Sequence, residues 1–61
     1  MKIEKLPKHV LFALKEDEKT EKEIQTMSVY EVFDFFLKYE GIIGYTSSIM
    51  NTYDKIKEAS E

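Results

Sequence analysis

SVYEVFDFFLKYEG, residues 28–41, carries helix signals at both of its ends. Ser28 with Glu31 matches the capping box, in which each side chain accepts a hydrogen bond from the other residue's backbone N–H. Gly41 suits the left-handed position that follows a helix, because it has no Cβ. These signals predict a helix over residues 29–40.

Two apolar contacts are expected to fix the ends of this helix. Met27 precedes the capping serine and is placed to pack on Val32. Ile42 follows the glycine and is placed to fold back on Leu37. Beyond them, Gly44 permits a second unusual backbone angle or a close helix approach.

A second helix is predicted directly after the glycine-containing turn. Thr46 is a suitable N-cap for a helix over residues 47–59. Its apolar positions recur at helical spacing and are Ile49, Tyr53 and Ile56, with Met50 alongside. The short connection predicts an antiparallel helical hairpin at residues 29–59.

The N-terminal quarter predicts one more helix. Pro7 suits a first helical turn, so the helix is expected over residues 7–16. Its apolar stripe is Leu6, Val10 and Leu14, with Leu11 beside it. A strand over residues 9–14 is the weaker alternative, because no other segment alternates with period 2 to pair with it.

The sequence does not decide whether the link over residues 15–26 is a loop or a helix. Its first nine residues, KEDEKTEKE, contain no apolar side chain and are typical of a solvated turn or an exposed helical link. Thr20 with Glu23 is nevertheless a second capping box, which indicates a short helix through Ile24 to about Thr26.

Together these elements predict an all-α, compact three- to four-helix domain. The chain has 61 residues, which allows one domain, residues 1–61. Hydrophobic residues make up 43% and charged residues 34% of the chain, which is typical of a chain that folds and not of a disordered one. There is no cysteine, so disulfides and thiolate metal sites are excluded.

The net charge of −3 is unevenly spread. Residues 1–15 carry four lysines and one acid, whereas residues 16–61 carry five lysines and eleven acids. This acidic body and the absence of arginine argue against nucleic acid as a partner. A weak nucleic-acid binder would have to use the basic N-terminal segment, with Lys2, Lys5, Lys8 and Lys15.

No catalytic, metal or cofactor site is expected. His9 is the only histidine, and its neighbours complete neither a triad nor a zinc site. The two glycines form no phosphate-binding loop, and Asp34 with Lys38 is an ordinary i, i+4 helix pair. The sequence therefore predicts a protein that is not an enzyme and has no evident small-molecule substrate.

The helix over residues 29–40 carries more apolar surface than one core needs. The expected core face is Val29, Val32, Phe33, Phe36 and Leu37. Three aromatic residues fall outside it, and they are the candidate interface: Tyr30, Phe35 and Tyr39. Either the N-terminal helix covers them or they bind a partner protein, most simply as a homodimer.

The acids of the link suggest a different function. A candidate acidic patch is formed by Glu16, Asp17, Glu18, Glu21 and Glu23. Carboxylates spaced like phosphates would let the protein act as a decoy that occupies a nucleic-acid-binding groove. That alternative requires the acids to lie along one surface.

The run YEGIIGYTSSI behind an acidic-aromatic helix resembles small uncharacterised proteins that phages and prophages of low-GC Gram-positive bacteria encode. The resemblance covers about residues 28–56 and is carried by Gly41, Ile42, Gly44, Tyr45 and Thr46. It implies no specific activity. It implies one class of role, because small phage accessory proteins often bind host proteins.

The sequence thus predicts a small non-enzymatic protein–protein binding module that self-associates, and the resemblance adds a phage accessory role in modulating a host factor. The expected location is the cytoplasm, which is the host cytoplasm for a phage protein. No segment is apolar and long enough to suggest a membrane span or a signal peptide.

Overall fold

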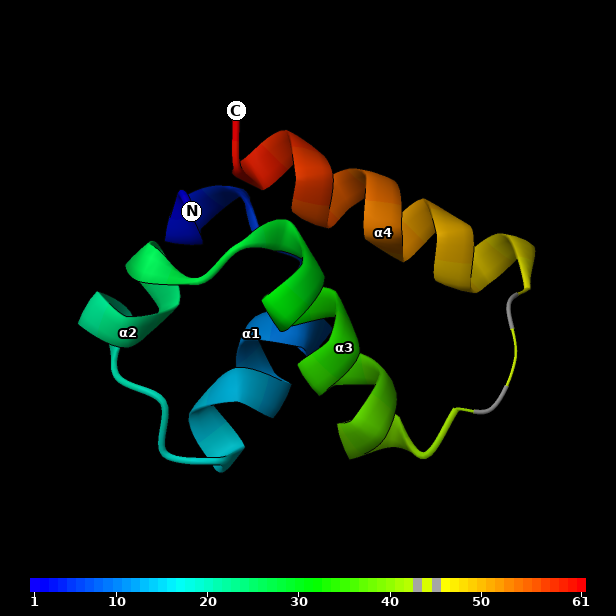
Figure 1. The fold of residues 1–61 in the computed structure, drawn as a ribbon, viewed down its shortest axis with the longest axis horizontal. Coiled ribbons are helices and arrows are strands. Elements are labelled where there is room, and N and C mark those ends of the chain that lie inside the picture. The colour runs from blue at the N-terminus through cyan, green and yellow to red at the C-terminus, as the bar shows by residue number, and fades with distance from the viewer. Residues whose placement is uncertain (43, 45) are drawn as a thin grey trace.

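The computed structural model describes residues 1–42, 44 and 46–61. The chain forms a short 3₁₀ helix and four α-helices (Figure 1), in the order η1 (Ile3–Lys5), α1 (Lys8–Glu16), α2 (Glu21–Thr26), α3 (Val29–Glu40) and α4 (Ser47–Ala59). The described residues contain no strand. The predicted all-α fold with three to four helices is therefore confirmed.

Helix α3 begins and ends at the predicted residues. The Ser28 hydroxyl accepts from the Glu31 backbone N–H at 3.2 Å, and the Glu31 carboxylate accepts from the Ser28 backbone N–H at 3.0 Å. Gly41 has a φ of 68°, in the left-handed region, and the Ile42 N–H donates to the Leu37 carbonyl at 3.0 Å. Both hydrogen-bonded ends are those that the sequence predicts.

The link between α1 and α3 contains both a loop and a helix. Thr20 and Glu23 form the expected capping box, and it starts α2. Helix α1 begins at Lys8 and not at Pro7, whose carbonyl accepts from the Val10 and Leu11 N–H groups. Pro7 keeps an extended ψ of 142° there, so it precedes the first turn instead of joining it.

An unpredicted left-handed residue ends α1. Glu18 has a φ of 61°, and the next N–H, of Lys19, donates to the Leu14 carbonyl at 3.1 Å. The same hydrogen bond forms after α3, where the residue that follows the left-handed Gly41 also bonds back to the helix. Here a glutamate occupies the position that favours glycine.

Helix α4 also begins as predicted, since the Thr46 hydroxyl accepts from the Ile49 N–H at 3.2 Å. The close helix approach expected at Gly44 is not found, because a Cβ there would meet nothing within 4 Å. Tyr45, which belongs to the resemblance, lies outside the described residues.

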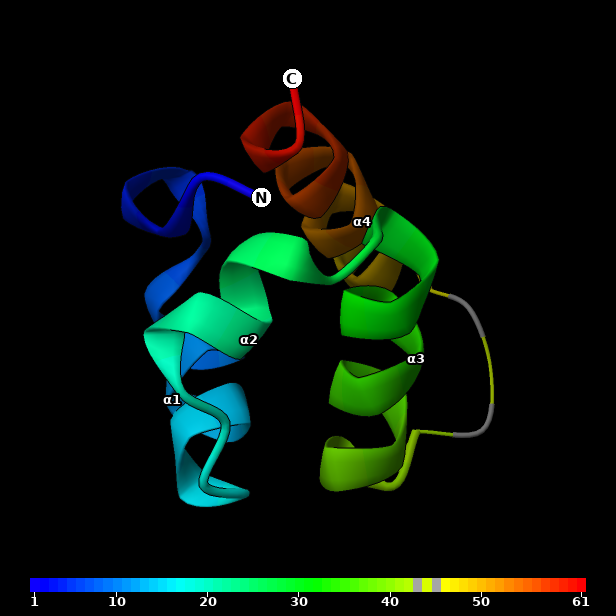
Figure 2. The same ribbon diagram turned by 60° about the vertical axis from the view of Figure 1, so that its left-hand side comes forward.

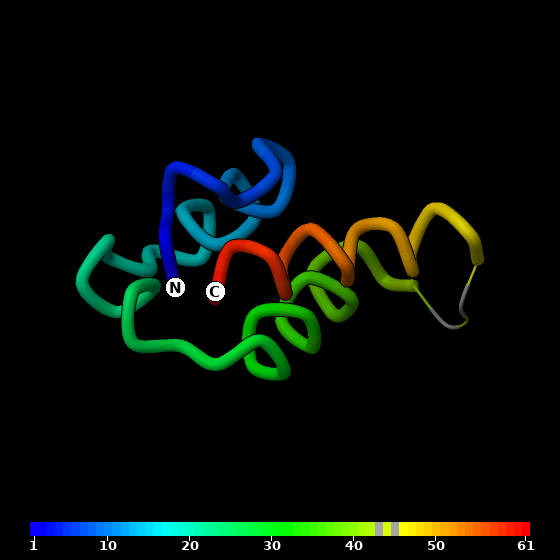
Figure 3. The backbone as a smooth tube through the Cα atoms, turned by 90° about the horizontal axis from the view of Figure 1, so that it is seen from above, coloured from blue at the N-terminus to red at the C-terminus, as the bar shows by residue number. Residues whose placement is uncertain are grey.

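Helix α3 lies at the centre of the packing. It contacts α1 on one side and α4 on the other, and α4 runs back across it obliquely (Figure 2). The first segment, η1, contacts α4, so the two ends of the chain lie side by side (Figure 3). The Lys2 N–H donates to the Ala59 carbonyl at 2.7 Å across this junction.

The core draws apolar side chains from every α-helix. The buried members are Leu6, Val10, Ala13, Leu14, Ile24, Val32, Phe36, Ile49, Ile56 and Ala59. The predicted stripe of α1 is thus confirmed. The predicted core face of α3 is buried only at Val32 and Phe36, while Val29, Phe33 and Leu37 are partly buried against it.

Candidate functional site

An apolar groove of about 400 Å³ lies between α3 and α4. Tyr30 and Phe33, one turn apart on α3, line one side of it, and Met50 and Tyr53, one turn apart on α4, line the other. This spacing places each pair on the flank of its helix that faces the neighbouring helix. The oblique crossing of α3 and α4 therefore creates the groove.

The groove has a packed base and an exposed rim. The rings of Phe33 and Tyr53 meet edge-on at its base, with centroids 5.0 Å apart. Tyr30 is 74% exposed and Met50 is 45% exposed. Aromatic rings and methionine are enriched where proteins bind each other, so this surface has the composition of an interface.

Carboxylates lie beside this apolar surface on both helices. A second depression shares Tyr30 and Phe33 with the groove, continues along α3 and is bordered by Glu31 and Asp34. On α4, burial raises the pKa of the Tyr53 hydroxyl, as do the neighbouring Tyr30 and the charge of Asp54. The groove therefore has acidic groups on both of its helices.

Two of these acids have defined partners within the chain. The backbone N–H and the side chain of Ser28 donate to Glu31 and lower its pKa, so Glu31 is ionised at neutral pH. Asp34 pairs with Lys38 at 3.0 Å, and both side chains are largely exposed. An exposed pair of this kind adds little stability and stays accessible to a partner.

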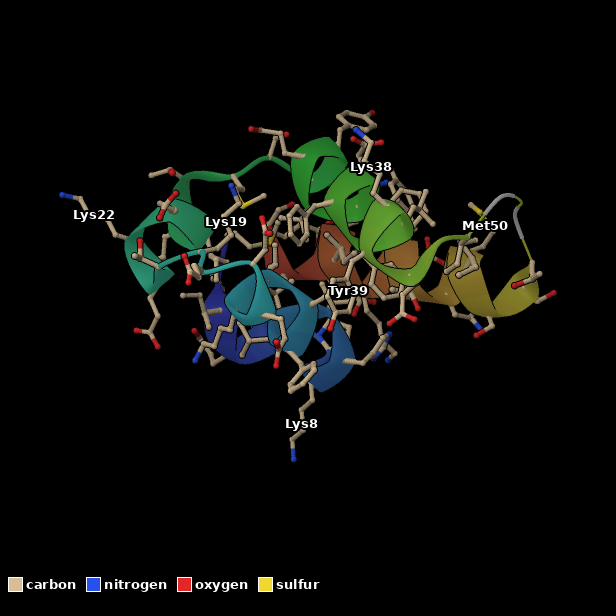
Figure 4. The ribbon with its side chains drawn as sticks, turned by 90° about the horizontal axis from the view of Figure 1, so that it is seen from below. Lys8, Lys19, Lys22, Lys38, Tyr39 and Met50 are labelled. Atoms are coloured by element: carbon tan, nitrogen blue, oxygen red, sulfur yellow. The ribbon has the colours of Figure 1, made fainter. Side chains whose placement is uncertain are left out.

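The three predicted interface residues do not share one surface. Tyr30 borders the groove, but Tyr39 lies about two and a half turns further along α3, which is the opposite side of the helix. Figure 4 shows Tyr39 on the side of α3 that faces α1. Phe35 is partly buried against the core, and the Lys19 ammonium lies 5.8 Å from its ring centroid.

Three groove residues were not predicted as site residues, because helical periodicity assigned them to the core. They are Phe33, Met50 and Tyr53. Each is at the edge of its apolar stripe. The only sequence signal for the groove was the excess of large apolar residues beside the stripes of two adjacent helices.

The predicted acidic patch is interrupted by lysines and partly used within the fold. The Glu21 carboxylate lies 3.7 Å from the Lys15 ammonium. Glu23 accepts hydrogen bonds from the Thr20 backbone and hydroxyl, which lower its pKa. Lys19 and Lys22 extend from the same end of the molecule (Figure 4). These contacts give the acids structural roles and do not add to the decoy hypothesis.

The basic segment contains an apolar residue that the sequence analysis did not single out. Phe12, on the outer face of α1, is 59% exposed. Lys8 lies one turn before it and Lys15 nearly one turn after it, and both are exposed. Lys8 points away from the molecule, on the side opposite Lys38 (Figure 4). The outer face of α1 therefore carries an exposed aromatic ring between two lysines, with the exposed Glu16 one turn further on.

The remaining features of the described residues concern the surroundings of His9, metal binding and membrane spanning. His9 meets the Phe36 ring edge-on, with centroids 5.3 Å apart. Residues 1–42, 44 and 46–61 contain no group of three or more histidine or acidic side chains that could hold a metal ion. Within the same residues, no helix has both the length and the apolar character needed to cross a membrane.

Comparisons of the chain with protein-family models, with curated proteins and with solved structures find no significant match.

Proposed function

We propose that this chain is a protein–protein binding module, acting by binding and not by catalysis, whose site is the groove between α3 and α4. Its partner presents an amphipathic helix with a large apolar side chain flanked by lysines or arginines. The observation that carries the proposal is the exposed apolar surface of Tyr30 and Met50 above the Phe33–Tyr53 contact.

The size of the groove supports an inserted side chain. Its volume of about 400 Å³ lies within the range of about 300–1,000 Å³ that is typical of ligand sites. Tyrosine is one of the residue types most often found as a binding hot spot, and a partner inserted here would cover Tyr30. Insertion of an apolar side chain would remove Tyr30 and Met50 from water, which is the main source of binding free energy.

The charge around the groove supports a basic partner. Glu31 and Asp34 lie along one side, and Asp54 adjoins Tyr53 on the other. Lysines or arginines flanking the inserted side chain would meet these carboxylates. Such pairs at an interface rim mainly increase the rate of association and the selectivity for basic partners.

Nuclear magnetic resonance titration of the ¹⁵N-labelled protein tests the proposal. The probe is an amphipathic helical peptide with one phenylalanine between lysines, and its control is the same peptide with glutamates in place of the lysines. We expect the lysine peptide to shift the amide signals around Tyr30, Phe33, Met50 and Tyr53 and the glutamate peptide to leave them in place. Absence of shifts with the lysine peptide at millimolar concentration would overturn the proposal.

Two tyrosine variants give a matched comparison. Tyr30→Ala is expected to weaken peptide binding at least about tenfold, since it removes a rim residue from the groove. Tyr39→Ala, which removes the same side chain from the opposite side of α3, is expected to leave the affinity unchanged. Equal losses in the two variants would place the binding surface elsewhere.

A further inference from the structure

The outer face of α1 has the chemistry that we assign to the groove's partner. Phe12 projects a large apolar ring, 59% exposed, between Lys8 and Lys15. The ion pair of Lys15 with Glu21, at 3.7 Å, joins two exposed side chains, so it is weak and leaves the ammonium available. The described part of the chain therefore contains a helix face on which two lysines flank an exposed ring, with Glu16 beside Lys15, and an apolar groove with acids next to it.

We propose that the groove of one copy of this protein binds α1 of a second copy, with Phe12 inserted between α3 and α4. This inference rests on the proposed function, because it names the occupant of the same groove. Lys8 and Lys15 lie toward the carboxylates of Glu31, Asp34 and Asp54. Copies of the chain are thus joined head to tail.

Charge favours this arrangement over one in which two grooves face each other. In a two-fold arrangement, Glu31, Asp34 and Asp54 of one copy would approach the same acids of the other. Lys38, the lysine that α3 places nearest, lies 3.0 Å from Asp34 and offsets the charge of only one of these three acids. Docking of α1 instead brings two ammonium groups to the acids, so opposite charges meet.

The position of the two surfaces requires a second copy. In Figure 4, Lys8 points away from the side of the molecule on which Lys38 lies, and Met50 lies at the right-hand end of the molecule. A chain cannot place its own Phe12 in its own groove while α1 packs on α3. A contact between two different surfaces repeats from copy to copy and forms a ring or an open chain.

Two single substitutions separate the surfaces for a test by sedimentation equilibrium. Phe12→Glu blocks the α1 face, and Tyr30→Glu blocks the groove while placing an acid in the first turn of α3, where the helix dipole accepts it. Both positions are exposed, so both variants should fold, which circular dichroism checks. The single chain has a mass of 7.2 kDa.

We expect the wild-type mass to rise with concentration in low salt and each variant alone to remain at the mass of one chain. An equimolar mixture of the variants should form a complex of two chains and nothing larger. In that complex the intact groove of the Phe12→Glu chain binds the intact α1 of the Tyr30→Glu chain. Added salt should dissociate it.

The alternative outcomes distinguish the two proposals. If Phe12→Glu assembles like the wild type while Tyr30→Glu does not, α1 is not the occupant, but the groove remains the binding site. If the wild type stays a single chain at millimolar concentration, the head-to-tail inference is overturned, and the peptide titration still decides the function of the groove. Binding of a single-stranded oligonucleotide through Phe12, without self-association, would also overturn the inference.

Discussion

The ring of Phe33 meets the ring of Tyr53 edge-on, with centroids 5.0 Å apart and an angle of 67° between the planes. This contact joins the flank of α3 to the flank of α4, outside the buried core. It keeps the two helices together at the base of the groove. Aromatic pairs in this geometry contribute about 0.5–1.5 kcal/mol beyond their burial.

Tyr53 should ionise at a higher pH than an exposed tyrosine, because burial, Tyr30 and Asp54 all raise the pKa of its hydroxyl. In an ultraviolet difference titration we expect a late component that Tyr53→Phe removes. Asp54→Asn should move this component to lower pH by removing a nearby negative charge. Simultaneous titration of all tyrosines in the wild type would contradict the proposed geometry.

Gly41→Ala should lower the free energy of unfolding by about 1 kcal/mol, because alanine is strained in the left-handed conformation. Gly44→Ala is the matched control. A Cβ at Gly44 would meet nothing within 4 Å, so we expect no comparable loss there. Urea denaturation measures both, and equal losses would contradict the assignment.

Glu18→Gly should raise the free energy of unfolding by about 0.5–1 kcal/mol, since Glu18 has a φ of 61° and glycine relieves that strain. Glu16→Gly removes the same charge from the last residue of α1, where glycine relieves no left-handed strain, and should instead lower stability, by less than about 1 kcal/mol. A gain from Glu16→Gly in urea denaturation would show that charge, and not backbone conformation, is responsible.

Acid should destabilise the fold through its two capping boxes. Hydrogen bonds from Thr20 and Ser28 lower the pKa values of Glu23 and Glu31. Their stabilisation is complete above the ordinary glutamate pKa of about 4.3 and is lost as the pH falls through the lowered folded-state values.

Glu31→Gln tests this origin, because glutamine preserves the capping box but does not titrate. Thermal melting at pH 7 and at pH 3 should show a smaller difference for the variant than for the wild type. Glu16→Gln, which changes an exposed acid for which no such hydrogen bond is described, should leave the difference unchanged. An unchanged difference in Glu31→Gln would assign the acid sensitivity to other carboxylates.

Local signals explain what the sequence could predict. The ends of α3 depend on hydrogen bonds within a few residues of Ser28 and Gly41, and these were predicted correctly. The last residue of α1, Glu16, was also predicted correctly, but the left-handed residue that follows was not, because Glu18 holds that position and no glycine marks it. A capping motif is visible in a sequence only where it uses its preferred residue.

The groove depends on tertiary geometry, and periodicity alone could not define it. Phe33 and Tyr53 fall within apolar stripes, so their pattern is that of core residues. Only the oblique crossing of α3 and α4 leaves them at the base of an open surface. Phe35 shows the converse, since the loop that carries Lys19 partly covers a residue predicted to face a partner.

The junction between the first and last segments has a consequence for synthesis on the ribosome. The backbone of Lys2 is held by the Ala59 carbonyl, and η1 packs on α4. Because η1 is synthesised before α4, it must wait for α4 before it finds its native contacts. Until then the nascent chain lacks the helix that covers one side of α3, so this domain completes its fold only after α4 has been made.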